Sequence, residues 1–189
     1  MKSQDIVILL KLVSLQELEK QGKFNAPEGF PSREEPYSVR GLEASLNISK
    51  SEVNASINRS YASGLAIKDR ELGRAKPNRR DLFNFIIHGL KFAFPVRPGA
   101  MIRGIPTAFA APMLEDLLIS GGDYQYVWPY ALGKESGQSV EPLFKSVPDA
   151  IQNDNRLYEY LALVDAIRLG KQRETNLATE CLSERLLST

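Results

Sequence analysis

The sequence has very few of the residues that disulfide frameworks, metal sites and nucleophilic active sites need. Among its 189 residues there is one cysteine, Cys181, and one histidine, His88. A lone cysteine excludes an internal disulfide framework, and one cysteine with one histidine makes a Cys/His zinc site within a single chain nearly impossible, whereas a metal site of carboxylates alone remains open. No motif with a serine or cysteine nucleophile accompanies His88. We therefore expect no metal, no cofactor and no enzymatic activity.

Long hydrophobic runs are also missing. The longest apolar run near the N-terminus covers residues 6–10 and ends at Lys11. It is too short to span a bilayer, and it lacks the small-residue cleavage site of a signal peptide. The sequence therefore predicts a cytoplasmic protein that does not interact with a membrane.

An excess of one charge is absent from the whole chain but present in its parts. The 24 Lys and Arg residues against 23 Asp and Glu residues give a net charge of +1. Up to residue 98, however, 16 basic residues face 11 acidic ones, whereas the remainder has 8 against 12. The basic first part is suited to nucleic acid, and the acidic second part is suited to a protein or ligand partner.

What the sequence does contain is a series of amphipathic helices. Hydrophobic residues make up 43% of the chain, which is typical of a globular protein with a buried core. Ser3 is the expected N-cap of the first helix, and Asp165 with Arg168 is expected to form a surface pair on a later one. Apolar side chains three and four residues apart predict helices at residues 3–21, 38–46, 49–63, 79–94, 112–119, 155–169 and 177–189.

Strands are few in this prediction. Residues 65–67 form one short strand. Alternating aromatic residues at 124–128 predict a second strand, whose large side chains are expected in a core. Its expected partner is the apolar stretch at 140–144, across a polar loop at 133–139.

The chain is expected to divide after residue 80. Residues 22–36 and 95–111 are rich in glycine and proline, so both are expected to be irregular. The fold class is mainly α (α+β), with one domain at residues 1–80 and a mostly helical region at residues 81–189 that contains a small β-hairpin.

Residues 38–67 carry the signals of two short helices joined by a tight turn. Asn47, which tolerates a left-handed conformation, follows the first helix, and Ser49 with Glu52 three residues later forms a capping-box pattern. Gly64 ends the second helix, before a short apolar strand. This order resembles the winged helix-turn-helix module of bacterial transcription regulators, most closely the MarR-type family. The residues that carry the resemblance are Leu42, Leu46, Ile48, Ser49, Val53, Ile57, Gly64 and Leu65.

The resemblance implies that the second helix enters the major groove of double-stranded DNA and that the following strands form a wing on the DNA backbone. With Val53 and Ile57 packed inward, the outer face of this helix would contact bases and phosphates, and its capped N-terminus would bind a phosphate. Residues 68–80 add six basic side chains against two acidic ones. The candidate DNA-binding residues are Ser49, Lys50, Ser51, Asn54, Asn58, Arg59, Arg70, Arg74, Lys76, Arg79 and Arg80.

Two functions fit these features. The first is a sequence-specific, DNA-binding transcription regulator that acts as a homodimer, in which residues 81–189 serve dimerisation or bind a small-molecule effector. The second is an antitoxin-type interaction protein, in which residues 81–189 neutralise a partner toxin enzyme and residues 1–80 repress its own operon. An enzyme built on residues 124–144 is the weakest hypothesis, because no acid, base and nucleophile occur together there.

Overall fold

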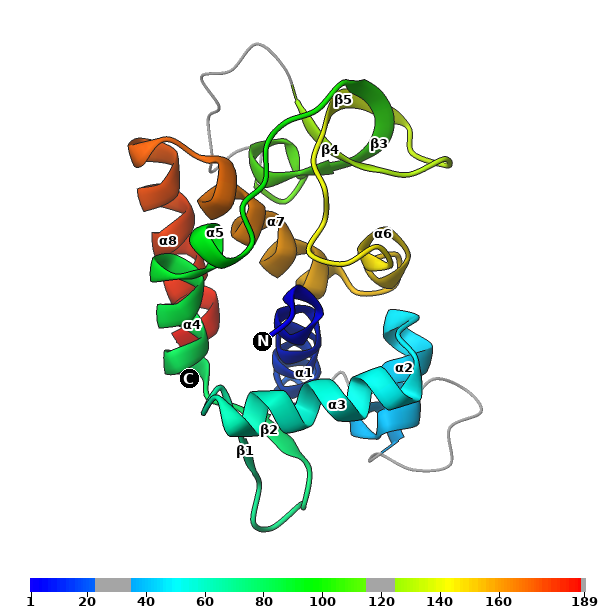
Figure 1. Cartoon of the computed structure of the whole chain (residues 1–189), viewed down its shortest axis with the longest axis vertical. Coiled ribbons are helices and arrows are strands. Elements are labelled where there is room, and N and C mark those ends of the chain that lie inside the picture. The colour runs from blue at the N-terminus through cyan, green and yellow to red at the C-terminus, as the bar shows by residue number, and fades with distance from the viewer. Residues whose placement is uncertain (23–34, 115–124, 188–189) are drawn as a thin grey trace. The chain divides into compact units, whose positions relative to one another are not determined.

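The computed structural model describes residues 1–22, 35–114 and 125–187 and has a mainly α (α+β) fold (Figure 1). The chain divides into two compact units, unit 1 (Met1–Leu82) and unit 2 (Phe83–Thr189). The boundary lies within helix α4 (Arg79–His88), which also contains the division indicated by the sequence. None of the helices in the described ranges is long and apolar enough to cross a membrane.

Unit 1 consists of helices followed by a small hairpin. Its two strands are antiparallel and pair Ile67 with Lys76. The observed bounds confirm the first three expected helices and the short strand, while the expected loop at 22–36 lies almost entirely outside the described residues. The elements are α1 (Ser3–Lys20), the short 3-10 helix η1 (Glu35–Tyr37), α2 (Val39–Leu46), α3 (Lys50–Ala62), β1 (Ala66–Lys68) and β2 (Ala75–Pro77).

Local signals explain where α2 begins and where α2 and α3 end. The Ser38 hydroxyl accepts a hydrogen bond from the Gly41 backbone N–H at 3.0 Å and so caps α2. Asn47 ends α2 in the left-handed conformation, with φ of 51°. Gly64 has φ of 75° just after α3, a conformation that is strained for a residue with a Cβ. These observations confirm the tight turn and the stop signal expected from the sequence.

Two expected caps are wrong. Lys2, not Ser3, is the N-cap residue of α1, and its backbone N–H donates to the Asp5 carboxylate at 2.8 Å. Ser49 precedes α3, but its side chain caps no backbone N–H, so the capping box with Glu52 does not form. The Glu52 carboxylate accepts instead from the cationic side chains of Lys2 and Arg59.

The core of unit 1 joins α1, α2 and α3. Ile6, Leu10, Leu42, Leu46 and Val53 are all fully buried. Within unit 1, α1 contacts α3, β2 and η1, while α2 packs against α3 and η1. Burial of each such side chain contributes roughly 1.5–3 kcal/mol, so these contacts set the position of α3.

Unit 2 combines a small barrel with two long helices. Strand β3 is antiparallel to both β4 and β5, which pair in parallel with each other, so the three strands close on themselves. Gly104 permits this closure, because a Cβ there would lie 2.0 Å from the Trp128 carbonyl oxygen. The elements are α5 (Leu90–Ala93), β3 (Met101–Thr107), η2 (Ala108–Ala110), β4 (Tyr126–Pro129), β5 (Glu135–Ser139), α6 (Val147–Ala150), α7 (Asn155–Leu169) and α8 (Gln172–Leu187).

The strands of unit 2 differ most from the sequence-based expectation. Residues 95–111, expected to be irregular, contain β3, and the expected polar loop at 133–139 contains β5. The expected partner strand at 140–144 does not form. Strand β5 can form despite its polar side chains because its backbone pairs with both other strands, and Gly137 allows a close approach to β4.

The helices of unit 2 follow the sequence more closely. Helix α7 confirms the helix expected at 155–169, and α8 confirms the one expected near the C-terminus. The single helix expected at 79–94 is broken at Gly89 into α4 and α5. The helix expected at 112–119 lies mostly outside the described residues, because the range 35–114 stops within it.

A buried carboxylate joins the barrel to α7. Asp165 accepts hydrogen bonds from Trp128 Nε1 at 2.6 Å and from Thr107 Oγ1 at 3.0 Å. Arg168 Nη1 lies 2.7 Å from the other carboxylate oxygen, and both charged side chains are almost fully buried. The expected surface pair is therefore wrong, whereas Trp128 occupies the core position expected for it. Burial raises the pKa of Asp165, and Arg168 and the neutral donors oppose that rise.

The substitution Asp165→Ala tests this network. It leaves the buried Arg168 guanidinium without its carboxylate, so we expect the free energy of unfolding to fall by about 3–5 kcal/mol in urea titrations. The control is Glu180→Ala on the exposed face of α8, with an expected change within about 0.5 kcal/mol. Equal effects of the two substitutions would contradict a structural role for Asp165.

Candidate nucleic-acid interface

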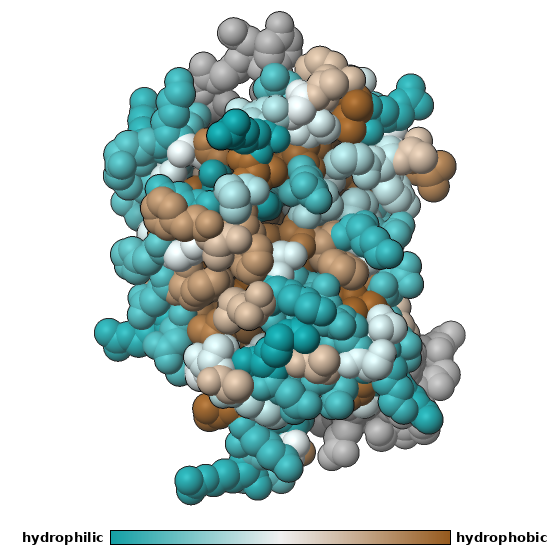
Figure 2. Space-filling view, in the orientation of Figure 1, coloured by the Kyte–Doolittle hydropathy of each residue, from teal (hydrophilic) through white to brown (hydrophobic). Residues whose placement is uncertain are grey.

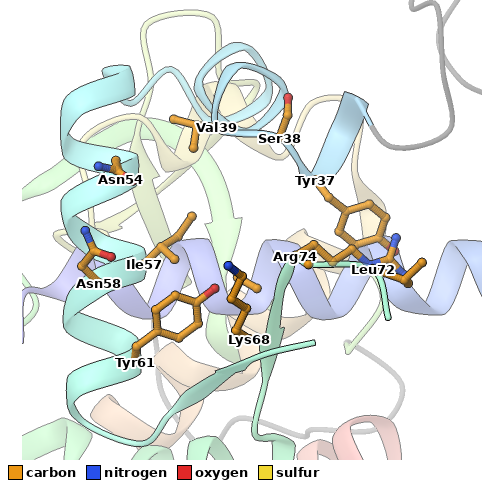
Figure 3. Close-up of a pocket in the computed structure, with 12 residues that line it drawn as sticks. Tyr37, Ser38, Val39, Asn54, Ile57, Asn58, Tyr61, Lys68, Leu72 and Arg74 are labelled. Carbon is orange, nitrogen blue, oxygen red and sulfur yellow. The ribbon is translucent and has the colours of Figure 1, made fainter. Parts of the chain in front are cut away.

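A groove lies between α3 and the β1–β2 hairpin of unit 1. It has a volume of about 520 Å³, and its lining also includes η1 and the start of α2. Figure 3 shows Asn54, Asn58 and Tyr61 along α3 on one wall, with Lys68 of the hairpin facing them and Arg74 further away, next to Tyr37. Amide, aromatic and cationic groups therefore meet in one groove.

The wall formed by α3 carries a row of polar side chains. Lys50, Asn54 and Asn58 follow one another at intervals of four residues, so they share one side of the helix, and all three are exposed. Their side chains form no hydrogen bond or ion pair with any other residue that the structure describes. Val53 points inward as expected, but Ile57 is only half-buried and lines the groove. The expected inward position of Ile57 is therefore wrong.

The opposite side of α3 is tied to α1 through Arg59. Its Nε and Nη2 donate to the two oxygens of Asp5 at 3.0 and 2.7 Å, and the Asp5 side chain is fully buried. Arg59 Nη2 also lies 2.7 Å from Glu52, which accepts from Lys2 Nζ at 3.0 Å. Arg59 is thus part of an ionic network within unit 1.

The pKa values in this network are shifted in favour of the charged forms. Burial raises the pKa of Asp5, but hydrogen bonds from Arg59 and from the Lys2 backbone lower it by more than burial raises it. The pKa of Asp5 is therefore below its ordinary value. The pKa of Arg59 is raised, mainly by its hydrogen bond to Asp5. Hydrogen bonds from Lys2 and Arg59 lower the pKa of Glu52. The ionic contacts between α1 and α3 therefore persist at neutral pH.

A carboxylate of the protein already occupies part of the N-terminus of α3. Glu43 Oε1, on α2, accepts from the Lys50 backbone N–H at 3.0 Å. Ser49 and Ser51, expected to help bind a phosphate here, are exposed, and their hydroxyl oxygens lie 3.4 Å apart. A phosphate at this end of α3 would have to compete with Glu43.

The tip of the hairpin is shaped by Asp69. Its Oδ1 accepts from the backbone N–H groups of Glu71 and Leu72, both at 2.9 Å, and these hydrogen bonds lower its pKa. Gly73 completes the turn with φ of 65°. Arg70 stands exposed at this tip and forms no ion pair with another residue in the described ranges.

Arg74 holds the hairpin to the rest of unit 1. Its guanidinium carbon lies 3.7 Å from the centre of the Tyr37 ring, and its Nη2 lies 2.6 Å from Glu19 Oε2. The Tyr37 hydroxyl donates to the same carboxylate oxygen at 2.8 Å. Burial, followed by this hydrogen bond, raises the pKa of Tyr37. The hairpin is therefore anchored to α1 and η1 by a stacked cation and a shared carboxylate.

The remaining basic candidates fall into paired and unpaired groups. Arg79 Nη1 lies 2.5 Å from Glu17, and its Nη2 donates to Gln16 at 3.1 Å. Lys76 Nζ is 3.9 Å from Asp69, so this pair is loose. Arg80 is exposed, and the described part of the chain offers it no carboxylate partner.

Lys68 and Tyr61 line the groove although neither was among the sequence-based candidates. Lys68 is exposed, unpaired among the described residues, and lines the groove from β1. Tyr61 is partly buried and continues the line of Asn54 and Asn58 one turn further along α3. The spacing of Tyr61 from Asn54 and Asn58 is a signal that could have identified it, whereas the position of Lys68 depends on the hairpin.

The surface around the groove combines charged and amide side chains with the exposed apolar side chains of Ile67 and Leu72. Figure 2 shows mainly hydrophilic residues over α3 and the tip of the hairpin. Three of the acidic side chains of unit 1, Asp5, Glu19 and Glu52, are paired with basic ones. Within residues 1–22, 35–114 and 125–187, no group of three or more His, Cys, Asp or Glu residues is arranged to hold a metal ion.

Comparison of the chain with protein-family models, with curated proteins and with solved structures finds no match. The geometry of unit 1 therefore carries the functional argument. Its groove is lined by Asn54, Asn58 and Lys68, whose side chains have no partner among the described residues. It is also lined by Arg74, which is paired with Glu19.

The Asp5–Arg59 contact predicts a specific dependence of stability on pH. The pKa of Asp5 lies below its ordinary value of 3.8, so its stabilising effect is complete above about pH 4 and is lost as the pH falls through the folded-state pKa. Asp5→Asn should lower the free energy of unfolding by about 2 kcal/mol at pH 7. It should also remove part of the loss of stability in acid, as measured by thermal unfolding between pH 2 and pH 7. The control, Glu71→Gln at the exposed hairpin tip, should keep the wild-type profile.

Proposed function

We propose that this protein is a sequence-specific transcription regulator that binds double-stranded DNA through unit 1. The observation that carries the proposal is the groove between α3 and the hairpin, which gathers Asn54, Asn58 and Lys68 with no competing partner among the described residues. Exposed amides read base edges, and unpaired cations neutralise phosphates. In this proposal α3 enters the major groove and the hairpin lies on the DNA backbone.

The order of elements in unit 1 supports the proposal. Helix, helix, tight turn, helix and antiparallel hairpin follow one another as in a winged helix-turn-helix module, the resemblance that residues 38–67 suggest. The left-handed Asn47 keeps the turn between α2 and α3 short. The Arg74–Tyr37–Glu19 contacts hold the hairpin beside α3, which places Arg70 at a protruding tip.

The structure narrows the set of residues that we propose as DNA contacts. Arg59, Arg74 and Arg79 are paired with carboxylates and are left out of this set, because each would have to leave its partner to bind a phosphate. The weakly paired Lys76 is a secondary candidate, and Ser49 and Ser51 remain candidates beside Glu43. The proposed contacts are Lys50, Asn54, Asn58, Lys68, Arg70 and Arg80.

A salt titration with single substitutions tests the phosphate contacts. Lys50→Ala, Lys68→Ala and Arg70→Ala should each weaken binding to the DNA upstream of the gene. Each should also reduce the slope of log affinity against log salt by about 1, because one fewer counterion is released per lost phosphate contact. Fluorescence anisotropy over a salt series measures both quantities.

The matched control is Lys134→Ala, which removes an exposed lysine of unit 2. It should leave the affinity and the salt slope unchanged. Binding that is absent or independent of salt, or a control that behaves like the unit 1 variants, would exclude the proposed interface. Circular dichroism establishes that each variant is folded.

We also propose that the protein acts as a homodimer. Two copies would place two α3 helices on half-sites separated by one turn of DNA, about 10 base pairs. Light scattering should give twice the mass of the chain, and DNase footprinting should show two protected half-sites with about that spacing. A monomer that protects a single half-site would contradict this part of the proposal.

A second candidate function is that of an antitoxin-type interaction protein. It is favoured by the large apolar side chains that unit 2 exposes among its described residues, which include Phe92 at 74% and Leu132 at 79%. In this function unit 2 binds a toxin enzyme while unit 1 represses the operon. Only this function requires a cognate protein, so co-purification with the product of the neighbouring gene distinguishes it from regulation through a small-molecule effector bound by unit 2.

A further inference from the structure

The four described asparagines of unit 1 fall into two groups, those with a structural role and those without one. Asn47 forms the left-handed turn after α2, and Asn78 exchanges hydrogen bonds with Asp81 at the start of α4. Asn54 and Asn58 have no such structural role. Both are exposed, both line the groove, and neither side chain has a hydrogen-bond partner among the described residues. Their amide groups are therefore available to a ligand.

We propose that Asn54 and Asn58 each recognise one adenine in the major groove, so that the half-site contains two adenines separated by one base pair. This inference rests on the proposed DNA-binding function. A primary amide holds a donor and an acceptor side by side, which matches N6 and N7 of adenine in a bidentate pair. Guanine presents two acceptors there, so the amide oxygen would meet an acceptor.

The spacing of the two adenines follows from the helix. Asn54 and Asn58 are four residues apart, and an α-helix rises 1.5 Å per residue, so the side chains are about 6 Å apart along the axis. Base pairs in DNA follow at 3.4 Å, so this distance corresponds to about two steps. The next side chain in the row, Lys50, lies one turn earlier and extends the contact beyond the first adenine.

The surroundings of the two amides support this assignment. Ile57 lies between them on the groove side of α3, as Figure 3 shows, and offers an apolar surface that suits the methyl group of a thymine. The bidentate Arg59–Asp5 pair restrains rotation of α3 about its axis. The amides are thus oriented before DNA binds, which reduces the entropy lost in forming bidentate contacts.

The experiment begins with selection of bound duplexes from a random pool by the full-length protein. We expect the selected half-site to contain two adenines at the stated spacing. Replacing either adenine with 7-deazaadenine, which lacks the N7 acceptor, should weaken binding by about 10-fold. Asn54→Ala should abolish this sensitivity at one adenine and Asn58→Ala at the other, as in a double-mutant cycle.

The control is Asn153→Ala, which removes an exposed asparagine of unit 2 and should preserve both sensitivities. Both groove variants should keep the wild-type salt slope, because they lose base contacts rather than phosphate contacts. Salt-dependent binding without the adenine pair, or with no response to 7-deazaadenine, would overturn the inference and leave DNA binding intact. No binding to any duplex in the pool would overturn the proposed function itself.

Discussion

The bidentate pair between Asp5 and Arg59 is the contact on which the arrangement of unit 1 depends. A fully buried carboxylate is tolerated only with charged and hydrogen-bonding partners, and Asp5 obtains them from Arg59 and from the backbone of Lys2. Because the guanidinium approaches with two nitrogens, it restrains both the position of α3 and its rotation about the helix axis. The side of α3 that carries Asn54 and Asn58 is left to face the groove.

The basic side chains of unit 1 fall into two groups, those with a carboxylate partner and those without one. Arg59 and Arg74 lie against carboxylates of α1 and fix the geometry of α3 and the hairpin. Lys50, Lys68 and Arg70 have no carboxylate partner in the part of the chain that the structure describes, so they are available to bind an external anion. A count of positive charges treats both groups alike, although a paired cation gives little net attraction for a phosphate. The basic stretch at residues 68–80 therefore contributes only Lys68, Arg70 and Arg80 to the primary contacts of the proposed interface.

The sequence predicts those parts of the fold in which the interacting residues are close to one another along the chain. The helices α1, α2, α3 and α7 are predicted because their apolar period and end signals are local. Strands β3 and β5 are not, because a strand with polar or proline-interrupted sequence is recognised only by its partners, and β3 pairs with segments about 20 or more residues away. Asp165 and Arg168 fit a surface pair by spacing, but the barrel that buries them is built by distant residues.

The same distinction between local and long-range interactions applies to the candidate site. The sequence alone determined that Asn54 and Asn58 share a helix face with Lys50, since a spacing of four residues brings side chains to one side of a helix. Only the tertiary structure decided that Arg59 is held by Asp5, a residue 54 positions away, and that Arg74 stacks on Tyr37. It also placed Lys68 in the groove. The physical reason is that helix periodicity is a property of neighbouring residues, whereas the partner of a charge is whichever group the folded chain brings within a few ångströms.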